Sequence, residues 1–517
     1  VKNCKKLASL RKISCGSDRS MGFVIVISCL FAPWAFGVVH EWSILTMNVL
    51  GFSFGFLGLV KVVTTRLLER GDTENVVAKQ IPSAYKLNFL NFRILAIVSS
   101  IAILIYMFIH WLNARASFDE FSLTFDYYSS FVEWLPHSYD REKSWTLLVK
   151  YSSLVSFFWG LFVWFPERES RGRRTRNSKE GMKQHIDRSG ELVPKRVSML
   201  LTLIVVNAAV IALVGIVQRL DGNGTLLWIY TAEFVNKKSH FGPFAYRGNA
   251  AVFFNLIWPL AIYLFLLIRK KSSLERLNER IGSGPDTILI PVIILLSIIP
   301  LILGSRAGLI VAIILMVPCL RALLSDMVSK LASIGLGVLV IVVLIGGGIS
   351  LGADRTVSRL RDTIWGENVE TRSLHRLDTY KTTLLFARDH WLWGTGPGSF
   401  TGMYYVTRGL RDWKVDNTEM SVWDAWVHSD PLEILATFGV VGATLHVIQA
   451  GLICGLFFYG RNGASCPVDR TVIYACLGGF ILHSCVDFPF QIYSLQFMFV
   501  VVVAIGIHCR SEESRVP

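Results

Sequence analysis

Charged residues are scarce in this sequence, and their scarcity excludes most water-soluble folds. Asp, Glu, Lys and Arg make up 17% of the 517 residues, whereas hydrophobic residues make up 52%. A soluble domain of this length would expose far more charge, so the composition predicts an integral membrane protein that crosses the bilayer many times. The net charge of +14 comes from Lys and Arg in short connections, where they act as topology determinants rather than as a nucleic-acid-binding surface.

The usual sequence signals of disulfide, metal and nucleotide sites are also missing. The nine cysteines include no CxxC pair, so we expect neither a disulfide framework nor a metal site, and no cofactor. The glycine-rich run 394–400 lacks the Gly-Lys-Ser/Thr ending of a P-loop and is interpreted as a rigid turn. An internal repeat of the inverted-transporter kind is not visible either.

Long apolar runs are plentiful, and they predict an all-α fold. An α-helix needs about 20 apolar residues to cross the hydrocarbon core. We therefore predict a polytopic integral membrane protein with about 12 transmembrane helices and a large, partly helical periplasmic loop. The candidate spans are residues 22–39, 43–63, 93–112, 145–165, 198–218, 249–268, 287–304, 307–324, 331–352, 431–459, 471–488 and 490–508.

Basic residues alternate between the connections, and this alternation predicts the orientation. Residues 1–21 carry six Lys or Arg against one acid, and ten basic residues lie in 168–196. The segments 113–144 and 353–430 instead carry more acidic than basic residues. Because Lys and Arg accumulate on the cytoplasmic side, we expect a bacterial inner membrane protein with both termini in the cytoplasm and these two segments in the periplasm.

The spans and loops divide the chain into four regions. We expect a four-helix region with basic cytoplasmic loops over 1–198 and a core that carries the arginine sites over 199–352. The large periplasmic loop covers 353–430, and the C-terminal helices cover 431–517. Within the loop, residues 371–388 have helical spacing, with leucines on one side.

Two arginines fall at the expected outer face. Arg306 lies in a Gly-Ser-Arg-Ala-Gly turn between two spans, and Arg247 lies where an outer loop enters a span. For Arg306 we favour a function over snorkelling to lipid phosphate, because an arginine here runs against the charge bias. For Arg247 alone, hydrogen bonds to nearby loop carbonyls are an equal alternative. Together the two planar guanidinium forks would clamp a pyrophosphate.

His428 ends the long loop at the mouth of a span and is the candidate general base. Imidazole titrates near neutrality and can accept a proton from a sugar hydroxyl. The alternative is a histidine that supports the loop by hydrogen bonds. Asp430 follows it, and helix capping is the default role of such a residue. His483 and Asp487 are four residues apart and can pair on one helix face; a structural hydrogen bond is favoured, and acceptor binding is the alternative.

Together these pieces resemble the O-antigen ligase family, which also contains polysaccharide polymerases and bacterial O-linked oligosaccharyltransferases. The signature of that family is His-[Asn/Ser/Gln], nine residues, then Gly-x-x-[Gly/Thr/Val]. This sequence matches it with His428-Ser429 and Gly439-Val440-Val441-Gly442. Further resemblances are Ser305-Arg306-Ala307-Gly308, the run 394–400, Asn249 at the entry to its span, and His483 with Asp487-Phe488-Pro489.

The resemblance implies a metal-independent membrane glycosyltransferase. Its donor would be an undecaprenyl-pyrophosphate-linked glycan, and its acceptor a hydroxyl at the periplasmic face, with lipid A-core as the expected acceptor. The alternative is a polymerase of lipid-linked repeat units. A second alternative, a non-enzymatic transporter of lipid-linked sugars, is disfavoured because the candidate residues crowd one membrane edge. Beyond donor, acceptor and lipid bilayer, no nucleic acid is expected as a partner.

The resemblance also distributes roles among the candidate residues. It implies that His428, Arg306 and Arg247 are catalytic and that both arginines bind the pyrophosphate. Arg219 is another outer-face arginine in the connection before Arg247, so that assignment has a competitor. The remaining substrate-binding candidates are Asn249, His483 and Asp487.

Overall fold

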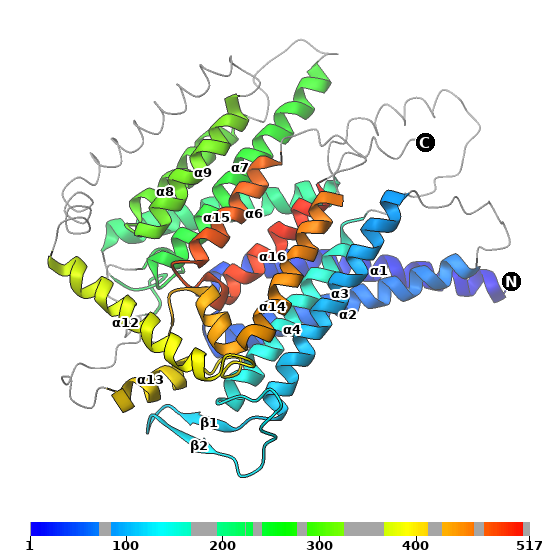
Figure 1. Ribbon diagram of the computed structural model, residues 1–517. Coiled ribbons are helices and arrows are strands. Elements are labelled where there is room, and N and C mark those ends of the chain that lie inside the picture. Colours follow the sequence, from blue (N-terminus) through cyan, green and yellow to red (C-terminus); the bar gives the residue numbers. More distant parts are fainter. Residues whose placement is uncertain are drawn as a thin grey trace, which may run out of the picture.

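The structure of the protein is a computed structural model (Figure 1). It describes residues 2–71, 84–166, 194–222, 224–230, 240–276, 287–324, 367–411, 426–459 and 470–509. Helices dominate this part of the chain, as the apolar runs predict.

Eleven of the twelve expected spans coincide with helices, and the remaining one, 331–352, lies outside the described residues. Eight of the eleven helices are long and apolar enough to cross a membrane, whereas α8, α15 and α16 are shorter apolar helices. The chain is therefore a multi-pass membrane protein, and the number twelve and the four-region division stay predictions. The helices are α1 (Lys2–Trp34), α2 (Glu41–Gly71), α3 (Ala84–Leu112), α4 (Arg141–Trp164), α6 (Lys195–Asp221), α7 (Arg247–Arg276), α8 (Leu289–Ile302), α9 (Arg306–Leu324), α14 (Asp430–Tyr459), α15 (Thr471–Ser484) and α16 (Tyr493–His508).

The loop regions hold further helices and a small sheet. α12 (Glu367–Asp389) and α13 (Phe400–Arg411) belong to the long loop. Strands β1 (Ala116–Asp119) and β2 (Thr124–Tyr127) form an antiparallel hairpin, which is an exception to the all-α prediction. α13 packs on this hairpin, where Phe118 stacks on Tyr405. Figure 1 shows α12, α13 and the hairpin at one end of the helix bundle.

α12 confirms the helix expected over 371–388, but its leucines do not form its packed face. Leu377 and Leu384 are 51% and 53% exposed, whereas Thr383 and Phe386 are buried. Phe386 contacts Phe400 of α13 within a small core beneath the loop. The spacing therefore predicts the helix correctly but not the side that packs.

α7 is the central helix of the bundle. Of its most apolar stretch, 94% is buried, and it packs against α6, α8, α9, α15 and α16. A helix that is apolar all round can be surrounded by lipid or by other helices, and α7 is surrounded by other helices. Since α7 is enclosed in this way, the position of its first residue, Arg247, is fixed by the whole bundle.

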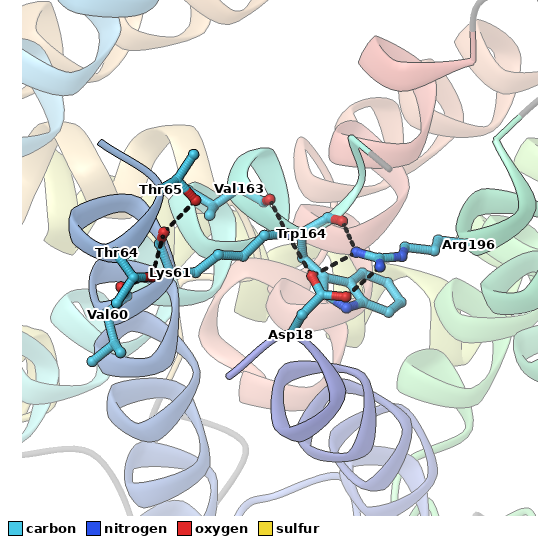
Figure 2. A network of polar contacts seen from close by, with 8 residues as sticks. All are labelled: Asp18, Val60, Lys61, Thr64, Thr65, Val163, Trp164 and Arg196. Atoms are coloured by element: carbon cyan, nitrogen blue, oxygen red, sulfur yellow. Dashed lines mark hydrogen bonds and ion pairs between the residues drawn. The ribbon is translucent and has the colours of Figure 1, made fainter. Parts of the chain in front are cut away.

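An ionic cluster ties four helices together at the other end of α4 from the hairpin (Figure 2). Asp18 of α1 accepts hydrogen bonds from Lys61 Nζ at 2.5 Å and from Arg196 Nη1 at 2.9 Å. Arg196, at the start of α6, also donates to the carbonyl of Trp164 and lies over its ring, 5.1 Å from the centroid. Lys61 donates to the carbonyl of Val163 at 2.9 Å. One carboxylate thus connects α1, α2, α4 and α6.

We predict that Asp18→Ala destabilises the bundle by on the order of 3 kcal/mol, because it leaves two largely buried cations without their carboxylate. Thermal unfolding in detergent should show a melting temperature several degrees lower. The control is Asp119→Ala, whose carboxylate bonds within its own exposed turn to Phe121 and Ser122. Equal melting temperatures for the two variants would contradict a stabilising role of the cluster.

The long helix α14 is broken at Gly439, in the middle of the signature. Gly439 has φ 63° and ψ −174°, which no helix contains. The segment that follows α12 fills the break: the amides of Thr395 and Gly396 donate to the carbonyls of Ala436 and Thr437, at 3.1 and 2.8 Å. Beyond the break, the amides of residues 440 and 441 donate to the carbonyls of residues 391 and 392, at 2.8 and 3.2 Å. The groups that the break would leave unpaired therefore find partners.

Glycine is required on both sides of this contact. A Cβ added to Gly439 would lie 2.4 Å from the carbonyl oxygen of Leu392. A Cβ added to Gly394, which has φ 78°, would lie 2.4 Å from the carbonyl of Thr437. Only glycine combines this backbone conformation with so close an approach. The interpretation of residues 394–400 as a turn is confirmed, and its partner is the signature itself.

We predict that Gly439→Ala lowers the melting temperature and the yield of folded protein. The added methyl group meets a carbonyl, and an alanine in this conformation costs at least about 1–2 kcal/mol before the clash. The matched control is Gly451→Ala in the same helix, where nothing lies within 4 Å of the added Cβ. Gly451→Ala should be neutral or stabilising by roughly 0.5–1 kcal/mol; if both variants behave alike, the contact is not critical.

Candidate functional site

His428 lies directly before α14, at the end of the bundle that carries α12 and α13. Its backbone has φ 57°, a left-handed conformation that is uncommon for residues other than glycine. The residue is 8% exposed, and its ring stands edge-on to Phe488 with 5.0 Å between centroids. Tyr380 of α12 donates a hydrogen bond to the His428 carbonyl at 3.1 Å. The loop helix thus fixes the conformation of this histidine.

The side chain of His428 pairs with Asp487. Nδ1 lies 3.3 Å from Oδ1 of Asp487, which is buried in the connection between α15 and α16. Burial alone would raise the pKa of this carboxyl, but the contacts with His428 and His483 lower it below its usual range. Asp487 is therefore a carboxylate at neutral pH. A carboxylate at Nδ1 favours the tautomer that leaves the Nε2 lone pair open to accept a proton.

His483 contributes a second imidazole, although not by the hydrogen bond that the sequence favours. Its Nε2 lies 3.8 Å from Oδ2 of Asp487, beyond hydrogen-bond distance, and the ring is fully buried. α15 ends at Ser484, earlier than the expected span 471–488, so Asp487 has left the helix on which the pairing was predicted. The histidine that bonds Asp487 is instead His428, 59 residues away in the sequence.

The N-terminus of α7 contacts the carboxylate of Asp487. Tyr246 donates a hydrogen bond to Oδ2 of Asp487 at 3.4 Å, and a Cβ added to Gly248 would lie 2.8 Å from that oxygen. Arg247 stands between these two residues and opens the helix, and Asn249 is buried in the same turn. The predicted anion ligand Arg247 therefore lies on the segment that contacts the His428–Asp487 pair.

Arg306 opens α9, whose first turn packs on the first turns of α7. Asn255 of α7 donates to the carbonyl of Gly308 at 2.8 Å, and a Cβ on Gly308 would lie 2.4 Å from Ala251. Ala251 is one turn beyond Arg247, and Gly308 is two residues beyond Arg306. The glycine of the Ser-Arg-Ala-Gly motif thus brings two helix N-termini together, each with an arginine. The aligned peptide dipoles of both helices add positive potential there.

Arg219 has a structural role. Its Nη1 donates to the carbonyl of Ile302 at 3.0 Å and its Nη2 to that of Leu303 at 3.4 Å. It therefore binds the last carbonyls of α8, where a cation complements the helix dipole. Arg219, the competitor of Arg247 in the sequence, is therefore used to bind a helix C-terminus.

A buried polar cluster connects the His428 segment with the Asp487 segment. Asp430 was expected to cap α14, but its carboxylate accepts from the amide of Phe490 at 2.9 Å and from the side chain of Gln491 at 3.4 Å. Lys150 of α4 donates to the carbonyl of Gln491 at 2.9 Å, and Glu433 is buried in the same region. Lys150 is missing from the sequence-based candidates, although a lysine inside an apolar span is a signal for such a site.

The pair of Trp426 and Tyr246 encloses the ring of Phe488 next to His428. The ring of Phe488 is stacked with Trp426 at 5.3 Å and with Tyr246 at 5.7 Å between centroids.

In the described part of the chain, no group of three or more His, Cys, Asp or Glu side chains is placed to hold a metal ion. The arrangement places the His428–Asp487 pair beside a helix N-terminus that begins with Arg247.

The lowered pKa of Asp487 predicts how its contribution to stability depends on pH. A carboxyl with a lowered folded-state pKa stabilises the protein above its unfolded value of 3.8, and this contribution is lost as pH falls through the folded value. Melting curves should therefore show wild type above Asp487→Asn with its full advantage at pH 5, and a smaller advantage at pH 3. An advantage that has already vanished at pH 5 would contradict the pairing.

Residues 291–447 match the family model described as O-Antigen ligase. The match includes Arg306 and His428, whereas Arg247 and Asp487 lie outside it. No curated protein matches the chain. The predicted resemblance to the O-antigen ligase family is confirmed.

Proposed function

We propose that this protein transfers a glycan from an undecaprenyl-pyrophosphate donor to an acceptor hydroxyl, because residues 291–447 match the O-antigen ligase family model and the chain is a multi-pass membrane protein. One observation carries the proposal: the His428–Asp487 pair adjoins the N-terminus of α7, which packs on the N-terminus of α9. Transfer from a glycosyl pyrophosphate needs a proton acceptor for the nucleophile and cations for the leaving group, and this site contains both.

In the proposed reaction, Asp487 holds Nδ1 of His428 so that Nε2 faces the acceptor hydroxyl. Nε2 takes the hydroxyl proton as the oxygen forms a bond to the anomeric carbon. The bond between that carbon and the phosphate oxygen breaks, and its electron pair leaves with the lipid pyrophosphate. Arg247 and Arg306 stabilise the negative charge that develops on this leaving group.

The two helix N-termini strengthen this anion site. Backbone amides at the first turn of a helix point outward and carry the positive end of the dipole. α7 and α9 both begin at the site, so a pyrophosphate there faces two such ends as well as two guanidinium groups. The prenyl chain of the donor would lie against the apolar helices.

We place the site at the periplasmic face of a bacterial inner membrane, with both termini in the cytoplasm. The basic connections predict this orientation, and the site lies at the bundle end that carries the loop helices α12 and α13 (Figure 1). We propose lipid A-core as the acceptor, because the matching family is described as O-antigen ligase. In a polymerase, the same chemistry would act on a second lipid-linked glycan, and the product would distinguish the two.

We predict that His428→Ala and Arg306→Ala each reduce glycan transfer by at least about 100-fold, the scale of a general base or an anion-stabilising donor. The assay combines purified protein in nanodiscs with a lipid-pyrophosphate glycan and rough lipopolysaccharide, and it follows the product on gels. The control is Arg321→Ala, in the last turn of the helix that Arg306 opens, and it should transfer like wild type.

The assay also has an outcome that rejects the mechanism. If both variants insert and fold normally and transfer at the wild-type rate, neither a base at His428 nor an anion site at Arg306 is needed. Elongation of the donor glycan without any lipopolysaccharide product would keep the chemistry and replace ligation by polymerisation.

A further inference from the structure

An apolar groove lies between α2 and α3. Both helices pack on α4, which forms the floor of the groove, and they do not pack extensively on each other. The groove has a volume of about 430 Å³, within the range of about 300–1,000 Å³ that is typical of ligand pockets. Eight of its nine lining residues are hydrophobic, and the ninth, Ser152, donates to the carbonyl of Leu148 in its own helix at 2.7 Å. The groove therefore fits an apolar chain.

Aromatic rings mark one end of this groove as the level of the membrane surface. Trp111, near the end of α3, and Trp145, near the start of α4, lie 4.7 Å apart between centroids. The guanidinium of Arg141 lies over the ring of Trp111 at 5.6 Å and over that of Tyr128 at 5.7 Å. Because Trp and Tyr gather at the membrane–water interface, a cation stands at interface level at this mouth of the groove, which Trp111, Trp145 and Arg141 form.

The groove extends about as far as one leaflet of a bilayer. Its lining residues Trp145, Val149 and Ser152 are spaced at three or four residues on α4, so they share one face with Arg141, one turn before Trp145. At the rise of an α-helix, Arg141 and Ser152 lie about 16 Å apart along the axis. Half of the hydrocarbon core measures about 15 Å. A lipid chain with its headgroup at the mouth would therefore fill the groove to the bilayer centre.

No carboxylate pairs with Arg141 in the part of the chain that the structure describes, and the residue is exposed. Lys143, two positions further on, is by contrast paired with Glu120 at 2.9 Å. Asp140 caps the helix by accepting a hydrogen bond from the amide of Lys143 at 3.0 Å. The N–H donors of Arg141 are therefore available to a ligand, and their planar fork matches the oxygens of a phosphate.

Charge, and not apolar contact, selects the occupant of this groove. Some chain fills it, because an empty groove would lose van der Waals contacts along its walls. Lipid tails are all about as apolar as the groove, however, so contact with the chain distinguishes little between the lipids of a membrane. A zwitterionic headgroup would bring its own cation next to Arg141, whereas an anionic headgroup brings a phosphate without one.

We infer that the groove between α2 and α3 binds one acyl chain of an anionic glycerophospholipid, whose phosphate lies on Arg141. One groove and one unpaired cation match one chain and one phosphodiester of such a lipid. The lipid would join α2, α3 and α4, and should therefore stabilise the bundle. This inference does not rest on the proposed function.

Lys150 separates this lipid site from the His428 site. It is two residues from Leu148, which places it about 200° further around α4. From that side it donates to the carbonyl of Gln491 at 2.9 Å, in the segment that follows Asp487. The groove and the His428–Asp487 pair thus lie on opposite sides of α4, so the lipid is not the glycan donor.

The test measures binding of phosphatidylglycerol and phosphatidylcholine to the full chain in detergent by native mass spectrometry. Wild type should prefer phosphatidylglycerol, and Arg141→Ala should weaken its binding roughly tenfold, as expected when a charge-assisted hydrogen bond is lost. The matched control is Lys143→Ala, which removes the same charge from the same helix end and should keep the preference. Phosphatidylglycerol should also raise the melting temperature of wild type and Lys143→Ala by several degrees, but not that of Arg141→Ala.

A second pair of variants tests the groove itself. Ile105→Trp fills the groove from an exposed position and should weaken phosphatidylglycerol binding as strongly as Arg141→Ala does. The control is Ile94→Trp, which is exposed on the same face of α3 about 16 Å away and outside the groove. Ile94→Trp should bind the lipid like wild type.

Three results would overturn the inference. Equal affinity of wild type for the two lipids, or a preference that persists in Arg141→Ala, would exclude selection by this arginine. Tighter binding of lipid A than of phosphatidylglycerol, lost in Arg141→Ala and Ile105→Trp, would assign the groove to a different lipid. Stabilisation by inorganic phosphate equal to that by phosphatidylglycerol would leave an anion site without a lipid. None of these measurements uses glycan transfer, so their outcome is distinct from that of the proposed function.

Discussion

The contact between the break in α14 and the segment after α12 is the constraint on which the site depends. A helix interrupted among apolar neighbours leaves amides and carbonyls that water cannot reach, and each unpaired group costs free energy. Residues 391–396 supply the missing partners on both sides of Gly439. This contact seats α12 against α14, and α12 brings Tyr380 to the carbonyl of His428. Backbone pairing at the break in α14 thus sets the position of His428.

The second connection is made by buried polar side chains. Asp430 follows His428 closely and bonds the backbone of Phe490, while Lys150 bonds the carbonyl of Gln491. These contacts hold the segment that carries Asp487 at a fixed place relative to His428. Buried polar groups contribute little net stability when paired, but they are costly to leave without partners. The contacts of Asp430 and Lys150 favour one arrangement of residues 487–491, because any other arrangement would leave these buried side chains without partners.

Much of this architecture could be predicted from the sequence, because it follows from local patterns. Apolar runs located the helices, the signature located His428, and the Ser-Arg-Ala-Gly motif located Arg306. The predicted pairing of His483 with Asp487 is present as a contact of 3.8 Å, but the favoured hydrogen bond is not formed. The i, i+4 rule holds only on a continuous helix, and α15 ends at Ser484. The leucines of α12 gave a wrong prediction of its packed face for a similar reason. That face is determined by contacts with α13 and α14, which lie elsewhere in the sequence.

The basic side chains at the two ends of the bundle have different electrostatic surroundings. At one end, Lys61 and Arg196 share the carboxylate of Asp18, so their charges are compensated within the protein. At the other end, Arg247 and Arg306 stand at helix N-termini, where the dipole disfavours a positive charge. Under the proposed function, a pyrophosphate bound between the two termini would offset this unfavourable interaction. The residues at this end would then serve binding more than folding, which is the compromise expected where function selects the residues.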